Sequence, residues 1–227
     1  MPGIGLLNEK PLHASLKAWY AQPGDQFEVA VDGFVIDIVR DGLLLEIQTG
    51  NFSAIKSKLN TLVHNHRIRL IYPIAQEKWI IKTPKDENGE IVRRKSPKKG
   101  RVEDLFWELV RFPRLVTESN FALEVLMIKE EDVRRHDGKR NWRRKGWGIE
   151  ERRLLDVVDR RLFEEPAHWR GLLPTSLEGP FTTKDLAEAA GIRRALAQKM
   201  AYCLRNMNVI GSAGKNGRAN LYVMAPD

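Results

Sequence analysis

Apolar residues recur at helical spacing between residues 6 and 20, and a Gln22-Pro23-Gly24-Asp25 stretch then ends the pattern. Three runs with strand-like composition follow, at residues 27–31, 34–39 and 43–48. A second helical pattern covers residues 52–63, and a further strand is expected at 68–74. The first third of the chain therefore predicts the order helix, strand, strand, strand, helix, strand.

The middle of the chain gives weaker signals. Asn88-Gly89 lies between two apolar runs and predicts a hairpin with a charged tip. Arg93 to Arg101 holds six basic residues in nine and is expected to form an exposed loop. Residues 102–110 show helical spacing, whereas residues 121–128 fit either a strand or a helix.

The last third of the chain predicts helices followed by a hairpin. An amphipathic helix is expected at 149–163, and a second one at 184–190 would be capped by Thr182 or Thr183. A glycine turn leads to a third helix at 193–207, and two short apolar runs then flank a hairpin with a basic tip.

These patterns predict an α/β (α+β) fold with two domains. The first covers residues 1–147, with a core at 5–82 and a basic hairpin and helix extension at 83–147. The second covers residues 148–227. A chain of 227 residues with 42% hydrophobic residues is long and apolar enough to bury a core in each domain.

Charge is distributed unevenly. The net charge is +8, yet residues 1–66 carry five basic and seven acidic residues, so the remainder carries +10. A cationic body favours a polyanionic partner, most simply nucleic acid, although a basic surface kept for solubility is the alternative. The single Cys203 excludes an intramolecular disulfide, and no membrane segment or signal peptide is evident, so we expect a cytoplasmic protein with no membrane partner.

The candidate chemistry lies in the hairpin at Asp41-Gly42. With a two-residue turn there, facing residues have numbers that add up to 83, so Asp37 faces Glu46 about 5 Å away at Cβ. Gln48 lies on the same face of the strand as Glu46. Facing carboxylates repel unless something offsets them, and Mg²⁺ or Mn²⁺ is one remedy. A nearby cation, a shared proton or a bulge that shifts the register are the alternatives.

These residues and the element order resemble the PD-(D/E)XK nuclease superfamily over about residues 5–75. The positions of its Asp and (Asp/Glu)-x-Lys motif are taken here by Asp37, Glu46 and Gln48. The resemblance implies a restriction-endonuclease-like αβββαβ core with a mixed sheet. It also gives a role to Glu9 on the first helix, where many resolvase-like members carry an additional acid.

One departure from the superfamily concerns its lysine, which is replaced by Gln48. Some restriction enzymes of the superfamily carry glutamine there and cleave DNA. In other members a lysine of the following helix takes over, a role open to Lys56 or Lys58; the alternative is that these lysines belong to a solvated helix face. An inactive nuclease fold kept for binding is the further alternative.

Two regions are candidates for nucleic-acid contact. Residues 134–153 hold nine basic side chains in twenty, and Trp142 and Trp147 lie between them in the sequence. The alternative is that both tryptophans pack into the domain interface and the charges solvate a linker. Residues 149–225 resemble a winged helix-turn-helix domain, which implies a recognition helix with basic residues at its start and a basic wing. The nucleic-acid-binding candidates are Arg140, Arg143, Arg144, Lys145, Arg193, Arg194, Gln198, Lys199, Lys215 and Arg218.

The sequence therefore leads to two main hypotheses, and a third, an adaptor whose winged helix mediates protein contacts, stays open. The first is a Mg²⁺- or Mn²⁺-dependent phosphodiesterase acting on DNA, in which Asp37 and Glu46 hold the ion and Gln48, Glu9 and Lys56 assist. Cutting both strands of a duplex with one such site per chain favours a homodimer. The second is a DNA-binding regulator or targeting subunit, without catalysis, on a degenerate nuclease scaffold.

Overall fold

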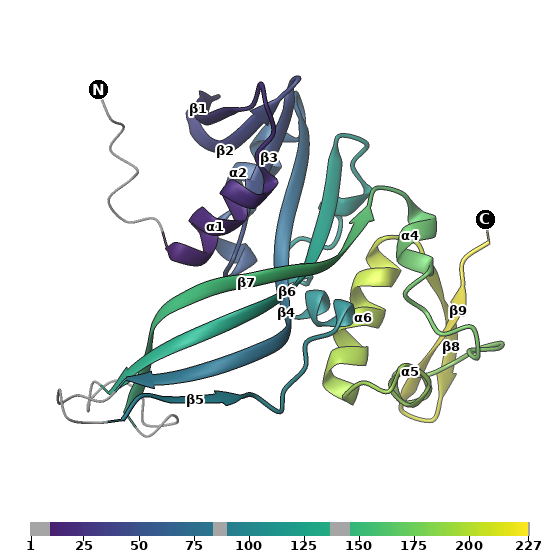
Figure 1. The fold of residues 1–227 in the computed structure, drawn as a ribbon. Helices are drawn as coiled ribbons and strands as arrows, with labels where there is room; N and C mark the ends of the chain where they lie inside the picture. The colour runs from purple at the N-terminus through teal and green to yellow at the C-terminus, as the bar shows by residue number, and fades with distance from the viewer. Residues whose placement is uncertain (1–9, 84–89, 137–145, 227) are drawn as a thin grey trace. The chain divides into compact units, whose positions relative to one another are not determined.

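The computed structural model describes residues 10–83, 90–136 and 146–226 (Figure 1). The described residues form a mixed α/β structure, as expected. Its elements are α1 (Pro11–Tyr20), β1 (Gln26–Val31), β2 (Phe34–Arg40), β3 (Leu43–Ile47), the 3-10 helix η1 (Phe52–Ala54), α2 (Lys56–Leu62), β4 (Arg67–Thr83), β5 (Val92–Lys95), η2 (Val102–Leu105), α3 (Phe106–Leu109), η3 (Leu115–Thr117), β6 (Phe121–His136), β7 (Trp147–Phe163), α4 (Pro166–Arg170), α5 (Thr183–Ala190), α6 (Arg194–Asn206), β8 (Ile210–Asn216) and β9 (Ala219–Met224).

The strands form two sheets. The larger has the order β1-β2-β3-β4-β6-β7, with β5 paired to β4, and the smaller consists of β8 and β9. The element order from α1 to β4 confirms the predicted succession of helix, three strands, helix and strand. None of the helices in the described ranges is long and apolar enough to cross a membrane.

The chain divides into two compact units, each assembled from three separate segments. Unit 1 consists of residues 1–49, 71–101 and 125–160, and unit 2 of residues 50–70, 102–124 and 161–227. The boundary expected between residues 147 and 148 falls at the start of β7.

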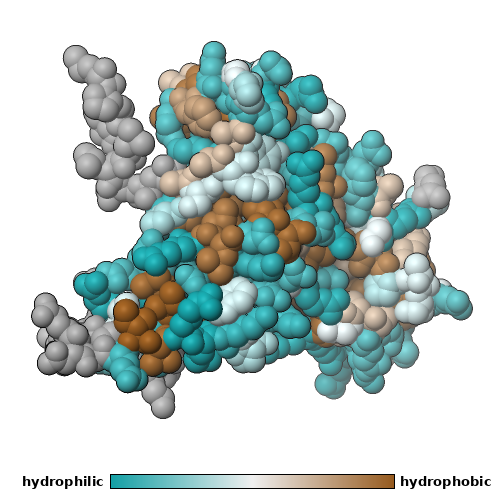
Figure 2. Space-filling model, viewed as in Figure 1, coloured by the Kyte–Doolittle hydropathy of each residue, from teal (hydrophilic) through white to brown (hydrophobic). Residues whose placement is uncertain are grey.

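Unit 1 is built around α1 and the large sheet. Its core contains Leu12 and Leu16 of α1 together with Ile38, Leu45 and Ile47 of the β2–β3 hairpin, all at most 3% exposed. Leu126 and Ile128 of β6 complete this core, and two partly buried residues of β7 border it. Figure 2 shows hydrophobic surface between α1 and β7, within an otherwise largely hydrophilic face.

Unit 2 has an aromatic core and a helical C-terminal part. Phe52 and Phe112 stack with ring centroids 5.1 Å apart, and Phe163 stacks on Trp169 at 4.4 Å. Helices α5 and α6 pack against each other, and the β8–β9 hairpin follows. The predicted N-cap Thr182 is confirmed, because its side chain accepts hydrogen bonds from the backbone N–H groups of Lys184 and Asp185.

Two sequence interpretations need correction. Residues 149–163 are not an amphipathic helix but most of strand β7. Their paired apolar residues suit either element, and strand pairing at the end of the sheet decides between them. The segment 93–101, expected as a loop, begins with strand β5. Residues 121–128, whose pattern fits either a strand or a helix, belong to strand β6.

Candidate functional site

The candidate site is built on the β2–β3 hairpin. Asp41 and Gly42 both have positive φ, 47° and 76°, which is the conformation of a two-residue type I′ turn. The pairs Ile38↔Leu45, Val39↔Leu44 and Arg40↔Leu43 confirm the expected register. The hairpin therefore brings Asp37 and Glu46 to the adjacent position on neighbouring strands.

The pairing of the two strands ends just before these acids. Its last pair is Ile38↔Leu45, and the predicted pairing of Asp37 with Glu46 is not part of the ladder. The Asp37 carboxylate instead accepts a hydrogen bond at Oδ2 from the backbone N–H of Ile47, at 2.7 Å. Asp37 thus lies at the end of the ladder, hydrogen-bonded to the residue that follows Glu46.

His13 of α1 joins this arrangement. Its Nε2 lies 3.2 Å from Oδ2 of Asp37, and both side chains are largely buried, with 20% and 13% exposed. The site residues predicted from the sequence do not include His13. No local pattern indicates it, because its partner Asp37 is 24 residues away in the chain.

The opposite end of the hairpin is fixed to α1 by Arg40. Its Nε donates to Oδ1 of Asp25 at 2.7 Å, and its Nη2 donates to Oδ2 of Asp25 and to the carbonyl of Tyr20, each at 2.8 Å. The hydrogen bond from Arg40 holds the pKa of the Asp25 carboxyl below its ordinary value. These contacts hold the helix that carries His13 against the strands that carry the acids.

The end of β3 is held by two further contacts. Gln48 donates its backbone N–H to the carbonyl of Ile71 at 2.9 Å, and Arg152 donates from Nη1 to the carbonyl of Thr49 at 2.9 Å. Gln48 and Glu46 are half-buried. Arg152 therefore fixes the backbone directly after the Glu46-x-Gln48 motif.

A buried carboxylate in turn positions Arg152. Glu130 is fully buried, and its Oε2 accepts from Nη2 of Arg152 at 2.8 Å, while Lys78 lies 2.6 Å from Oε1. Asp132, two residues along β6, is also buried and pairs with Arg134 at 3.0 Å. Charges removed from water in this way require close partners, so the network sets the position of the arginine.

The donor set around the hairpin consists of oxygen atoms. Two carboxylates and an amide oxygen suit Mg²⁺ or Mn²⁺, which complete their shell with water and phosphate oxygens. Within the described ranges, no three or more His, Cys, Asp and Glu side chains form a group that could hold a metal ion. Asp37 and Glu46, with the Gln48 amide oxygen, are the residues whose chemistry suits such an ion.

The structure does not test the expected roles of two other predicted site residues. Glu9 lies outside the described residues. Lys56 belongs to unit 2, where it is exposed on α2, while Lys58 is partly buried on the same helix. The structure therefore leaves the expected assistance by Glu9 and Lys56 as a prediction.

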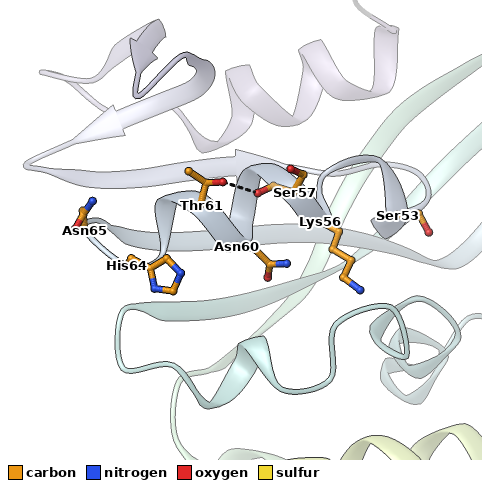
Figure 3. Close-up of a pocket in the computed structure, with 7 residues that line it drawn as sticks. All are labelled: Ser53, Lys56, Ser57, Asn60, Thr61, His64 and Asn65. Atoms are coloured by element: carbon orange, nitrogen blue, oxygen red, sulfur yellow. Dashed lines mark hydrogen bonds between the residues drawn. The ribbon is translucent and has the colours of Figure 1, made fainter.

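Lys56 lines an open polar cavity of about 730 Å³ along α2 (Figure 3). Its side chain and those of Asn60 and His64 point to the same side of the helix, whereas Thr61 bonds back to the carbonyl of Ser57. The buried Ile55 and Leu59 directly precede Lys56 and Asn60 in the sequence. This helix face is the solvated one that the sequence indicated for Lys56.

The basic stretch 134–153 is only partly described. Arg140, Arg143, Arg144 and Lys145 lie outside the described residues. The arginines that are described make ion pairs within unit 1, namely Arg134 with Asp132, Arg135 with Glu150, Arg152 with Glu130 and Arg153 with Glu151. Trp147 packs under Lys82, whose Nζ lies 4.6 Å from the ring centroid. These pairs favour a structural role for the described part.

The candidates in the C-terminal part are mostly exposed. Arg193 precedes the first residue of α6, and Arg194 and Gln198 lie on its exposed face. Lys199 is half-buried, with Nζ 5.5 Å from the ring centroid of Trp107. Lys215 and Arg218 are exposed at the tip of the β8–β9 hairpin.

The fold and site define a mixed α/β protein whose acidic residues lie on a hairpin braced by a helix. The chain belongs to the family of the domain of unknown function DUF8091, whose family model matches residues 10–164. It is also 28% identical over 225 residues to an uncharacterized protein of Treponema pallidum (strain Nichols), across 98% of this chain and 88% of that protein. No solved structure matches it. The family match includes the whole of the hairpin site and ends directly after β7.

Proposed function

We propose that this chain is a Mg²⁺- or Mn²⁺-dependent phosphodiesterase that acts on DNA. The observation that carries the proposal is the position of Asp37 and Glu46, on adjacent strands at the point where the β2–β3 ladder ends. The order of elements from α1 to β4, which resembles that of PD-(D/E)XK nucleases, supports it. So does the net charge of +8, which suits a polyanionic substrate.

In this proposal Asp37 and Glu46 hold the ion and Gln48 adds its amide oxygen. When bound, the ion would activate water and stabilise the leaving oxygen of a phosphodiester. Ile47 and His13 orient the Asp37 carboxylate through their contacts with its Oδ2. Arg152 keeps Gln48 in place through the carbonyl of Thr49.

The C-terminal part would deliver the DNA. Helices α5 and α6 with the β8–β9 hairpin follow the order of a winged helix-turn-helix domain, and Gly191 makes the turn between the helices with a φ of 61°. Arg194 and Gln198 on α6 and Arg218 on the hairpin would contact duplex DNA.

The test is cleavage of duplex DNA by the purified chain with Mg²⁺, Mn²⁺ or EDTA. Glu46→Gln and Asp37→Asn are expected to reduce metal-dependent cleavage by roughly a hundredfold or more. Glu90→Gln, an equal change of charge at an exposed residue of unit 1, should leave the rate unchanged. A folded protein that cuts neither DNA nor RNA with either metal contradicts the proposal.

A second candidate is a DNA-binding protein without catalysis. One observation in its favour is Gln48, which stands at the position of the superfamily lysine. Another is that no group of three or more His, Cys, Asp and Glu side chains among the described residues could hold a metal ion. In that case DNA binding would not require metal and would persist in both acid variants. Titration of Mn²⁺ by calorimetry separates the two candidates, because only the first requires binding that Glu46→Gln weakens.

A further inference from the structure

Residues 92–101 of unit 1, here called the basic segment, hold a dense set of cations on the surface. Six of these ten residues are Lys or Arg, and all six side chains are exposed. The segment consists of strand β5 and the residues that follow it. None of these six residues is among the site residues predicted from the sequence.

The basic segment is fastened to β4 along its length. Strand β5 pairs with β4 from Trp79↔Lys95 to Lys82↔Val92. Beyond the strand, the backbone N–H of Ser96 donates to the carbonyl of Lys78 at 2.7 Å, and that of Gly100 donates to the carbonyl of Ala75 at 2.9 Å. A Cβ at Gly100 would lie 2.4 Å from that carbonyl oxygen, so this close approach requires glycine. The cations are therefore carried by an ordered backbone.

Two of the cations anchor the segment. Arg93 and Lys95 both lie over the ring of Trp79. The Cζ of Arg93 is 5.2 Å and the Nζ of Lys95 is 5.1 Å from the ring centroid. Both also form ion pairs, Arg93 with Glu131 at 2.7 Å and Lys95 with Glu77 at 2.8 Å. Their charges are thus largely satisfied within the protein.

Three of the remaining four cations are different. Arg94, Lys98 and Lys99 are exposed and make no ion pair with any of the described residues. Lys98 and Lys99 are adjacent in the chain, and Arg94 lies four residues before Lys98, at most about 13 Å away along the backbone. Exposed cations without an acidic partner attract phosphate groups, and this attraction weakens as salt is added.

We infer that Arg94, Lys98 and Lys99 of the basic segment bind the phosphate backbone of duplex DNA. The choice of DNA rests on the proposed function, whereas the anionic character of the partner rests on the segment itself. The contact is to phosphates and not to bases, because flexible cations on a surface strand neutralise charge without reading a sequence. The segment would hold substrate on unit 1 independently of the C-terminal helices.

The experiment compares two triple variants that change net charge equally. Arg94→Gln/Lys98→Gln/Lys99→Gln removes the proposed contacts, and Arg67→Gln/Arg111→Gln/Arg160→Gln removes three exposed arginines outside the basic segment and outside α6. Binding of a labelled duplex of about 20 base pairs is followed by fluorescence anisotropy in EDTA over a salt series, so that cleavage plays no part.

The first variant is expected to bind on the order of tenfold more weakly, and the slope of log affinity against log salt should fall by about 2.7, for three lost phosphate contacts. The control should keep the slope of the unmodified chain. Equal loss in both variants overturns the inference, as does binding to phosphatidylserine vesicles or to RNA but not to duplex DNA. If the chain binds DNA in this way yet never cleaves it, the inference stands and the phosphodiesterase proposal fails.

Discussion

The Asp37 carboxylate accepts the backbone N–H of Ile47 at 2.7 Å, so a side chain of β2 takes a hydrogen bond from the backbone of β3 where their ladder ends. Ile47 is only 3% exposed, and its N–H has little access to water. The same carboxylate is therefore both a proposed metal ligand and a structural acceptor.

This double role gives different expectations for two substitutions. Asp37→Ala removes the acceptor and should lower the free energy of unfolding by about 1–3 kcal/mol, the usual cost of leaving a buried donor unpaired. Asp37→Asn keeps a carbonyl oxygen and should cost clearly less, although both variants lose cleavage. Urea denaturation followed by circular dichroism measures the difference. Equal stability of the two variants would show that the hydrogen bond contributes little.

A second prediction concerns acid and the pair Asp25–Arg40. Because the hydrogen bond from Arg40 lowers the pKa of Asp25 below its ordinary value of 3.8, the folded state favours the ionised carboxylate. The stability from this pair is therefore present above pH 3.8 and is lost as the pH falls through the lower pKa of the folded state.

Asp25→Asn should accordingly destabilise the chain at pH 7 and have a diminishing effect as the pH falls below about 3.8. Unfolding by urea at several pH values between 7 and 2 measures the difference. Glu90→Gln, at an exposed position, serves as the control and should show no such trend. A difference that grows as the pH falls would have the wrong sign for this explanation.

A third prediction concerns the start of α5. Thr182 accepts the N–H groups of Lys184 and Asp185, and Asp185 accepts the N–H of Thr182 in return. Thr182→Ala should therefore lower the free energy of unfolding by about 1 kcal/mol, while Thr183→Ala, one residue inside the helix, should cost less. Thermal unfolding measures the stability of the two variants. A larger loss of stability for Thr183→Ala than for Thr182→Ala would show that Thr182 is not the N-cap.

The elements that sequence predicted well are those set by neighbouring residues. Asp41-Gly42 specifies its turn because both positions need positive φ, and the turn then sets the register of three pairs. The N-cap at Thr182 is likewise determined by residues close to it in the sequence. The helix predicted at 149–163 was wrong because paired apolar residues are compatible with a helix and with a strand. Pairing of this segment at the edge of the sheet makes it a strand.

For the candidate site, the sequence indicated the acids but not their surroundings. The hairpin register brought Asp37 and Glu46 to neighbouring positions, but the end of the ladder depends on how the Asp37 side chain bonds to Ile47. His13 and Arg152 reach the site from α1 and β7, and no local pattern reveals such contacts between distant segments. These long-range contacts are set by tertiary packing.

The last prediction addresses the support that Arg152 gives to the end of β3. Arg152→Ala removes one of the two cations beside the fully buried Glu130 and should cost about 3 kcal/mol of stability, as expected when a buried ion pair loses a partner. Combining it with Glu130→Gln should recover part of this loss, because the buried charge is then gone as well. Arg153→Ala removes an adjacent arginine whose ion pair with Glu151 is more exposed, and it should cost far less. Urea denaturation of the unmodified chain, Arg152→Ala, Glu130→Gln and the double variant completes a double-mutant cycle, with Arg153→Ala measured as the control. Strictly additive losses would show that Glu130 does not hold Arg152 in place.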